Sequence, residues 1–174
     1  MKRKAILMLM MVVIATTTSC SAKDSNSKST SHSIVATDTI MHKAVGDSIY
    51  RIITGAKKVE ITSLPLQSDS IKQTISKKVS SKELELMKFI ATNPKNYTDT
   101  IVYGVFLPQF QAVYNKKKEK VTLKYDFGLR KWGVFDAEGK QIVMYDLVSD
   151  NMLRFACKMF PDNQFFNELL LTRE

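Results

Sequence analysis

Apolar and polar residues alternate strictly along residues 120–127, and this alternation constrains the fold more than any other stretch of the chain. In a β-strand, successive side chains point to opposite faces of the sheet. One face of this strand would carry four apolar side chains: Val121, Leu123, Tyr125 and Phe127. A strand with one apolar and one polar face is typical of an antiparallel sheet that is covered on one side.

Runs of β-branched and aromatic residues on either side of this strand predict its neighbours. Polar or glycine-containing turns separate these runs, which cover residues 100–107, 110–114, 132–135 and 141–147. Tight turns join antiparallel neighbours. We therefore expect a small antiparallel meander sheet of about five strands, with a further strand over residues 58–62 earlier in the chain.

A helix is predicted between Ser80 and Asn93, just before the meander. Ser80 and Glu83 have the spacing of a capping box, and the Asn93-Pro94 step disfavours helical backbone angles. Residues 66–79, which precede this helix, lack a clear period and are expected to form a loop. The expected buried face of the helix is broad and carries Leu84, Leu86, Met87, Phe89, Ile90 and Ala91.

Three more helices are expected at the two ends of the domain. Residues 49–56 fit a short helix that begins after Asp47, with a strand over residues 50–54 as the competing interpretation. Near the C-terminus, Asp150 and Asp162 are each predicted to cap a helix.

These patterns together predict an α+β fold, in which helices pack on one face of the antiparallel sheet. Residues 47–174 suit a single domain with a modest core. The predicted strand that ends with Phe106 and Pro108, together with the hairpin that follows it, resembles small uncharacterised bacterial α+β domains. That resemblance implies no activity.

The first twenty residues have the three-part layout of an export signal. Lys2, Arg3 and Lys4 precede an apolar run over residues 5–15, and small residues lead to a cysteine. The sequence Thr17-Thr18-Ser19-Cys20 resembles the lipobox of a bacterial lipoprotein precursor. The resemblance implies that residues 1–19 are removed and that Cys20 carries the acyl chains, palmitate among them, as a lipid anchor.

Two other interpretations of this segment are a membrane-spanning helix and ordinary secretion. The apolar run has 11 residues, whereas a membrane-spanning helix needs about 20. Ordinary secretion, with cleavage near Ser19 and a free Cys20, remains open. The resemblance to a lipoprotein implies a location in the cell envelope, at the outer membrane, with the membrane itself as a partner.

The segment after Cys20 is predicted to be a flexible tether over residues 20–46. It is rich in Ser, Lys, Thr and Asn and has too little apolar surface to offset the entropy of ordering it. A coil of about 25 residues has a typical reach of roughly 25–30 Å. Ile40 and Met41 form a weak apolar island that is expected to pack on the domain as an extended segment.

The chain is basic. Its net charge of +9 falls to 9 − 3 = +6 once Lys2, Arg3 and Lys4 are removed with the signal peptide. A basic surface attracts anionic lipid, polysaccharide or nucleic acid, and outside the cytoplasm we expect no nucleic acid. Residues 116–118 and 130–131 are predicted to lie roughly 20–25 Å apart, at opposite ends of one strand, as solvated turns rather than one patch.

The placement of the histidines excludes several kinds of catalytic site. His32 and His42 both fall in the predicted tether, so we expect no Ser-His-Asp or Cys-His site in the domain and no histidine-bound metal. Cys157 lies on the apolar face of a predicted helix, where cysteine commonly acts as a small hydrophobe. Arg154 and Lys158 are close in sequence, which keeps a reactive thiol as an alternative. No cofactor is expected.

Two features of the sequence are compatible with a binding or hydrolytic site. Asp146 and Asp150 are close in sequence, although a strand end and a helix cap explain them equally well. Trp132 is either a core residue or an exposed platform for a sugar.

The sequence therefore favours a non-enzymatic envelope lipoprotein, a binding or assembly module whose partner is an envelope protein or polysaccharide. The alternative is a carboxylate-dependent hydrolase of envelope glycans. A hydrolase requires a cleft with two facing acids, at least one of them with a shifted pKa, whereas a binding module requires an exposed apolar or aromatic patch without such acids.

Overall fold

The computed structural model describes residues 40–66, 74–98 and 103–174. The predicted signal peptide, Cys20 and most of the predicted tether lie outside the described residues, as does part of the predicted strand over residues 100–107. The predictions for Cys20 and the signal peptide rest on the sequence.

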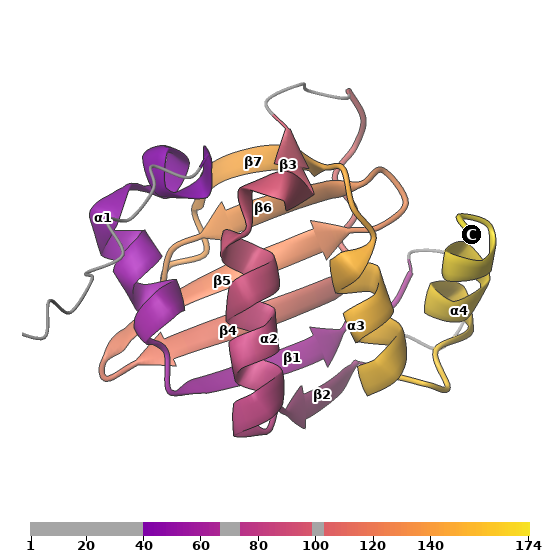
Figure 1. Ribbon diagram of the computed structural model, residues 1–174, viewed down its shortest axis with the longest axis horizontal. Helices are drawn as coiled ribbons and strands as arrows, with labels where there is room; N and C mark the ends of the chain where they lie inside the picture. The colour runs from indigo at the N-terminus through magenta and orange to yellow at the C-terminus, as the bar shows by residue number, and fades with distance from the viewer. Residues whose placement is uncertain (1–39, 67–73, 99–102) are drawn as a thin grey trace, which may run out of the picture. The chain divides into compact units, whose positions relative to one another are not determined.

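An antiparallel sheet of seven strands, in the order β2-β1-β4-β5-β6-β7-β3, forms one layer of the domain (Figure 1). The predicted meander is present as the consecutive strands β4 to β7. The sheet has seven strands rather than about five, because β1 and β2 extend one side and β3 the other. The bounds are β1 Lys58–Ser63, β2 Ile75–Lys78, β3 Tyr97–Thr98, β4 Phe110–Lys116, β5 Glu119–Asp126, β6 Lys131–Phe135 and β7 Gln141–Leu147.

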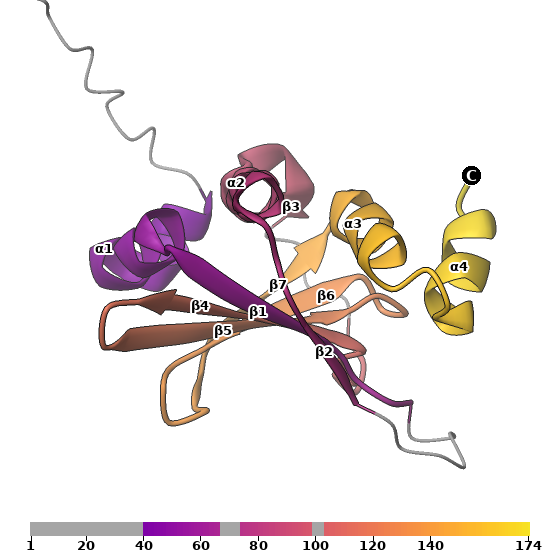
Figure 2. The same ribbon diagram turned by 90° about the horizontal axis from the view of Figure 1, so that it is seen from below.

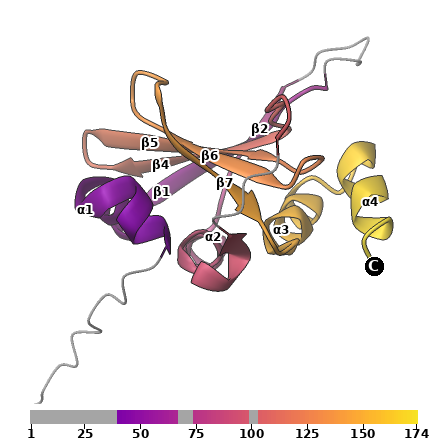
Figure 3. The same ribbon diagram turned by 90° about the horizontal axis from the view of Figure 1, so that it is seen from above.

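Helices cover one face of this sheet. Figures 2 and 3 show α1, α2 and α3 side by side on that face, with α4 beyond α3. The predicted α+β fold, with its helices on one face, is confirmed. The bounds are α1 Ile40–Gly55, α2 Ser81–Thr92, α3 Asn151–Met159 and α4 Gln164–Leu171, and a 3₁₀ turn, η1, covers Pro94–Asn96.

The core lies between the helices and the apolar face of the sheet. The residues whose alternation predicted the strand β5 are buried: Val121, Leu123 and Tyr125 are 0% exposed and Phe127 is 1% exposed. Phe166 of α4 packs against this layer, with its ring centroid 5.5 Å from that of Phe127 and its side chain 0% exposed. Burying an apolar side chain of this size contributes about 1.5–3 kcal/mol.

Helix α1 begins earlier than the sequence analysis placed it. The tether was expected to extend to residue 46, but the helix starts at Ile40 and bends at Gly46, where φ is 74°. Met41 is 0% exposed and Val45 is 8% exposed. Residues 40–46 therefore belong to the domain and are helical rather than extended, because both apolar side chains reach the core. The competing strand over residues 50–54 is wrong, since these residues are helical.

The predictions for two further segments, one loop and one strand, are also wrong. Residues 75–78, expected to be loop, form β2 at the edge of the sheet, and all four side chains are exposed, so no buried pattern marks them. Residues 103–107 are not a strand, although they are rich in β-forming residues. Tyr103 is 92% exposed and Val105 is 75% exposed, so neither gains the burial that would stabilise a strand here.

The two predicted C-terminal caps differ from the observed ones. Asp150 occupies the N-cap position of α3 but makes no capping hydrogen bond with its side chain. Its carboxylate instead faces Arg130 and Arg173, at 3.1 and 2.6 Å. Helix α4 is capped by Asn163 rather than Asp162, and the Asn163 side chain accepts a hydrogen bond from the Phe166 N–H.

The capping box of α2 is confirmed. The Ser80 hydroxyl accepts a hydrogen bond from the Glu83 N–H at 3.3 Å, and the Ser80 N–H donates to the Glu83 carboxylate at 2.9 Å. The latter hydrogen bond lowers the pKa of Glu83. The box fixes where α2 begins.

We predict that Ser80→Ala lowers the free energy of unfolding by about 1 kcal/mol, because the first turn of α2 loses its cap. Urea denaturation followed by circular dichroism measures this change. Ser81→Ala, one residue inside the helix, is the matched control and should have little effect. Equal destabilisation by the two variants would contradict the prediction.

Candidate functional site

His42 lies in the domain, contrary to the expectation that both histidines belong to the tether. It sits in α1, where its Nε2 is 2.6 Å from the Asp47 carboxylate and its ring centroid is 4.5 Å from that of Tyr50. His42 precedes the bend at Gly46, whereas Asp47 and Tyr50 follow it. These contacts join the two halves of α1, so we assign His42 a structural role.

Asp146 and Asp150, which are close in sequence, pair with different cations in the structure. Asp146 forms an ion pair with Lys131 at 3.0 Å. The side chain of Asp146 is 5% exposed and that of Lys131 is 4% exposed. Asp150 pairs instead with Arg130 and Arg173. Each carboxylate therefore faces its own cation, which is not the arrangement of a general acid and a general base.

Within the described ranges, no group of three His, Cys, Asp or Glu side chains is placed to hold a metal ion. No helix in the same part of the chain is both long and apolar enough to span a membrane.

Cys157 lies on the inner side of α3, where its thiol is 3.4 Å from the Phe166 carbonyl oxygen and is placed to donate to it. Burial raises the pKa of this thiol, and the nearby Arg154 guanidinium lowers it by less. A higher pKa leaves less of the nucleophilic thiolate at neutral pH. The structure therefore favours the core interpretation of Cys157 over the reactive one.

Trp132 is a core residue and not an exposed platform for a sugar. Its side chain is 0% exposed. Its ring stacks between those of Tyr125 and Tyr145, at centroid distances of 6.5 and 6.0 Å. The hydroxyls of Tyr114 and Tyr125 are buried in the same layer, and burial raises the pKa of both groups.

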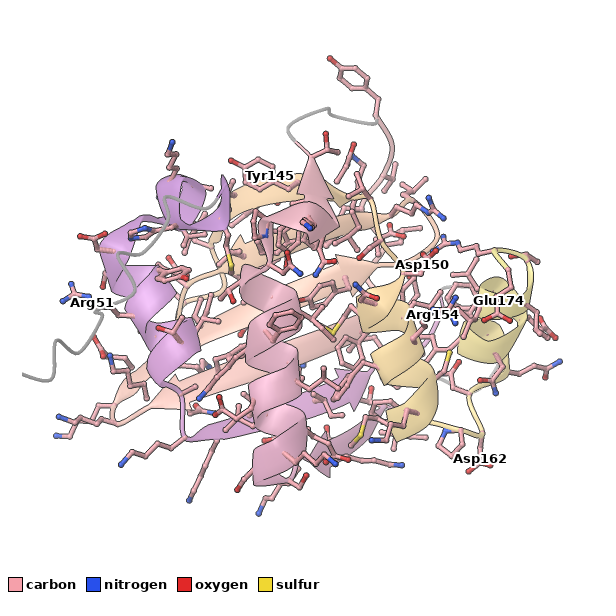
Figure 4. The ribbon with its side chains drawn as sticks, viewed as in Figure 1. Arg51, Tyr145, Asp150, Arg154, Asp162 and Glu174 are labelled. Carbon is pink, nitrogen blue, oxygen red and sulfur yellow. The ribbon has the colours of Figure 1, made fainter. Side chains whose placement is uncertain are left out.

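The cations near α3 and the C-terminus are paired with acids. Arg130 and Arg173 contact Asp150, Lys131 contacts Asp146, and Arg154 contacts Glu174 at 2.6 Å. Figure 4 shows Asp150, Arg154 and Glu174 gathered around α3 and the C-terminal residues, away from Arg51 on α1. This paired cluster leaves little positive charge available to a partner.

A different set of lysines lies at the opposite end of the strands. We call this set the basic end of the sheet; it consists of Lys57, Lys58, Lys78, Lys116, Lys117, Lys118 and Lys120. Six of the seven side chains are exposed, and Lys116 is partly exposed. On these ends of β1, β2, β4 and β5 the acids are Glu60 and Glu119, so their charge is 7 − 2 = +5. The adjoining β6–β7 turn, at the same end of the sheet, adds Asp136, Glu138 and Lys140.

The sheet register brings these lysines together. Lys58 pairs with Asn115, the Lys57 N–H donates to the Asn115 carbonyl, and Lys120 pairs with Asn115 from the other side. Lys78 lies opposite Glu60 on the outer neighbour of β1. The start of β1, the end of β2, the end of β4 and the start of β5 therefore meet at one end of an antiparallel sheet.

The lysines of the basic end are not paired with acids. Among the ion pairs formed by the described residues, none includes any of the seven. Lys116 donates a hydrogen bond to the Arg51 carbonyl oxygen at 3.0 Å. Three of the lysines, Lys57, Lys58 and Lys78, border a cavity of about 320 Å³ whose walls include Val59 and Leu84.

A second surface lies between α2 and α3. Leu86 and Phe89 were expected to be buried but are 42% and 64% exposed. They are turned away from the sheet and border a groove of about 310 Å³ whose other side includes Arg154 and Lys158. These two cations already face Glu174 and Glu83, at 2.6 and 4.0 Å, so the groove offers apolar contact without free charge.

The sequence pattern marked only residues 116–118 of the basic end. Residues 130–131, also expected to form a solvated turn, lie at the other end of β5 as predicted but are paired with acids, and Lys131 is buried. The remaining lysines come from segments that are distant in sequence. The pairing of β1 with β2 and β4 was needed to place them, and no local pattern carries that information.

The comparisons with known proteins define no family. No family model matches the chain, and no curated protein matches it. A crystal structure of a "Putative Lipoprotein from Clostridium perfringens" is similar to 68% of this chain and 90% of its own, with 11% identity and a TM-score of 0.42. A likeness of this degree carries no argument about fold or function.

We predict that Asp146→Asn lowers the free energy of unfolding by about 3–5 kcal/mol, because the Lys131 ammonium stays buried without its full counter-charge. Urea denaturation measures the change. Asp162→Asn, at an exposed loop position, is the control and should change stability by less than about 0.5 kcal/mol. The double variant Lys131→Met/Asp146→Leu should recover much of the loss. A double variant as unstable as Asp146→Asn would contradict this account of the pair.

Proposed function

We propose that the chain is an exported lipoprotein, anchored through Cys20, whose domain is a non-catalytic binding module for anionic groups in the cell envelope. The observation that carries the binding part is the basic end of the sheet, where seven lysines gather without acid partners among the described residues. The anchor rests on the lipobox-like residues that end at Cys20.

The distribution of charge supports binding rather than simple solubility. Acids neutralise the cations around α3, whereas the basic end keeps a local charge of 7 − 2 = +5. Charge that is concentrated on one surface attracts an anionic partner and orients it during association. The expected location is the outer membrane, with the domain held in the envelope by its acyl chains.

The alternative of a carboxylate-dependent hydrolase gains no specific support. The four cavities described for the domain each contain at most one acid: Asp162 in one, Glu60 in another and none in the remaining two. Release of reducing sugar ends from isolated envelope glycan by the purified protein would favour the hydrolase over the binding module.

We predict that Cys20→Ser abolishes incorporation of labelled palmitate and releases the protein from the membrane fraction. The serine hydroxyl does not replace the thiol as the site of lipidation. Metabolic labelling and intact-mass analysis measure both effects. Cys157→Ser is the matched control and should be labelled and retained like the wild type. Unchanged labelling of Cys20→Ser would rule out the proposed anchor.

We predict that a triple variant of the basic end, Lys57→Gln/Lys58→Gln/Lys118→Gln, elutes from a sulfonate cation exchanger at lower salt than the wild type. The control variant Lys95→Gln/Arg154→Gln/Lys158→Gln removes the same charge from exposed positions away from the basic end. The control should elute later than the first variant, because a concentrated cluster dominates retention. Elution of the two variants at the same salt concentration would argue against a dominant basic end.

A further inference from the structure

We propose that the basic end docks the domain onto anionic phospholipid headgroups of the membrane that holds its own lipid anchor. This inference rests on the proposed function and names the partner of its binding surface. In this arrangement the domain lies against the headgroups in a defined orientation.

The lysines of the basic end form an open row along the ends of four strands. Its lysines come from the ends of the neighbouring strands β2, β1, β4 and β5 and from the turns beside them. Neighbouring strands are about 4.8 Å apart, so four of them span about 14 Å. An open row of exposed ammonium groups can contact several headgroups of a surface at once.

The charge is sufficient for such a contact. Clusters of about four to eight Lys or Arg beside a membrane anchor are typical of segments that bind acidic lipids. The basic end carries seven lysines against Glu60 and Glu119. The attraction acts within about a Debye length of the surface, which is about 8 Å at physiological salt.

The connection to the anchor permits this orientation. Residues 21–39 separate Cys20 from α1. Helix α1 has 16 residues and bends at Gly46, so its two ends are no more than about 24 Å apart. Its C-terminal end lies against the basic end, where Lys116 donates to the Arg51 carbonyl. The segment that leads to Cys20 therefore enters the domain within about one helix length of the lysines.

Two observations favour headgroups over an anionic polysaccharide. The residue that the sequence offered as a sugar platform, Trp132, is fully buried. The strongly exposed aromatic rings among the described residues are Phe89 on α2 and Tyr103 in the segment before β4, neither of which belongs to the basic end. In addition, an anchor on the same chain keeps the headgroups at a high effective concentration, whereas a free polymer must diffuse to the protein.

The test uses the full lipidated protein, reconstituted in vesicles of neutral phosphatidylcholine or of phosphatidylcholine with phosphatidylglycerol. Acylation of individual lysines by a soluble succinimidyl ester is followed by mass spectrometry. We expect phosphatidylglycerol to slow acylation of Lys57, Lys58 and Lys118 by about tenfold, as for a docked population of roughly nine-tenths. Lys95 and Lys158 should react at the same rate in both vesicles. Salt at about 1 M, where the Debye length is about 3 Å, should abolish the protection.

Two variants and one added polymer decide the outcome. In Lys57→Gln/Lys58→Gln/Lys118→Gln, the protection of Lys117 and Lys120 on phosphatidylglycerol should fall to near zero, whereas Lys95→Gln/Arg154→Gln/Lys158→Gln should keep it. Protection by soluble dextran sulfate on neutral vesicles, but not by phosphatidylglycerol, would overturn docking on lipid and leave the proposed binding module standing. Protection by neither would overturn both.

Discussion

The antiparallel register between β1 and β4 is the constraint on which the proposed surface depends. It places Lys58 opposite Asn115 and brings the α1–β1 connection beside the β4–β5 turn. The core fixes this register, because Val59, Ile61, Ala112 and Tyr114 all turn toward the helices and are at most 3% exposed. A slip of one residue would expose these side chains. Hydrophobic burial thus indirectly holds the lysines together, against their mutual repulsion.

The two ends of the sheet treat charge differently. Around α3, Asp150 and Glu174 pair with three arginines, and Lys131 and Asp146 pair inside the protein. A buried pair is costly to break although it adds little net stability. The charges at this end of the sheet are therefore largely paired. At the basic end the lysines remain exposed and in excess over Glu60 and Glu119. Unrelieved repulsion destabilises a fold, and an anionic partner would relieve it.

Local sequence patterns predicted the structural features that depend on interactions between residues close in sequence. The alternation in β5, the capping box of α2 and the turns of the meander depend on neighbouring residues, and each is confirmed. Edge strand β2 has no buried face to mark it, and the start of α1 depends on Met41 reaching a core built by distant residues. The basic end was missed for the same reason, since strand pairing assembles it. Cys20 remains a prediction from the sequence.

The central claim is that the basic end, rather than the apolar groove between α2 and α3, is the binding surface. Backbone amide chemical shifts of the mature chain carrying Cys20→Ser, titrated with a soluble short-chain phosphatidylglycerol below its micelle concentration, test this claim most directly. We predict that the largest shifts fall on residues 57–58, 78 and 116–120 and disappear at high salt. Shifts centred on Leu86 and Phe89 that persist at high salt would contradict the claim.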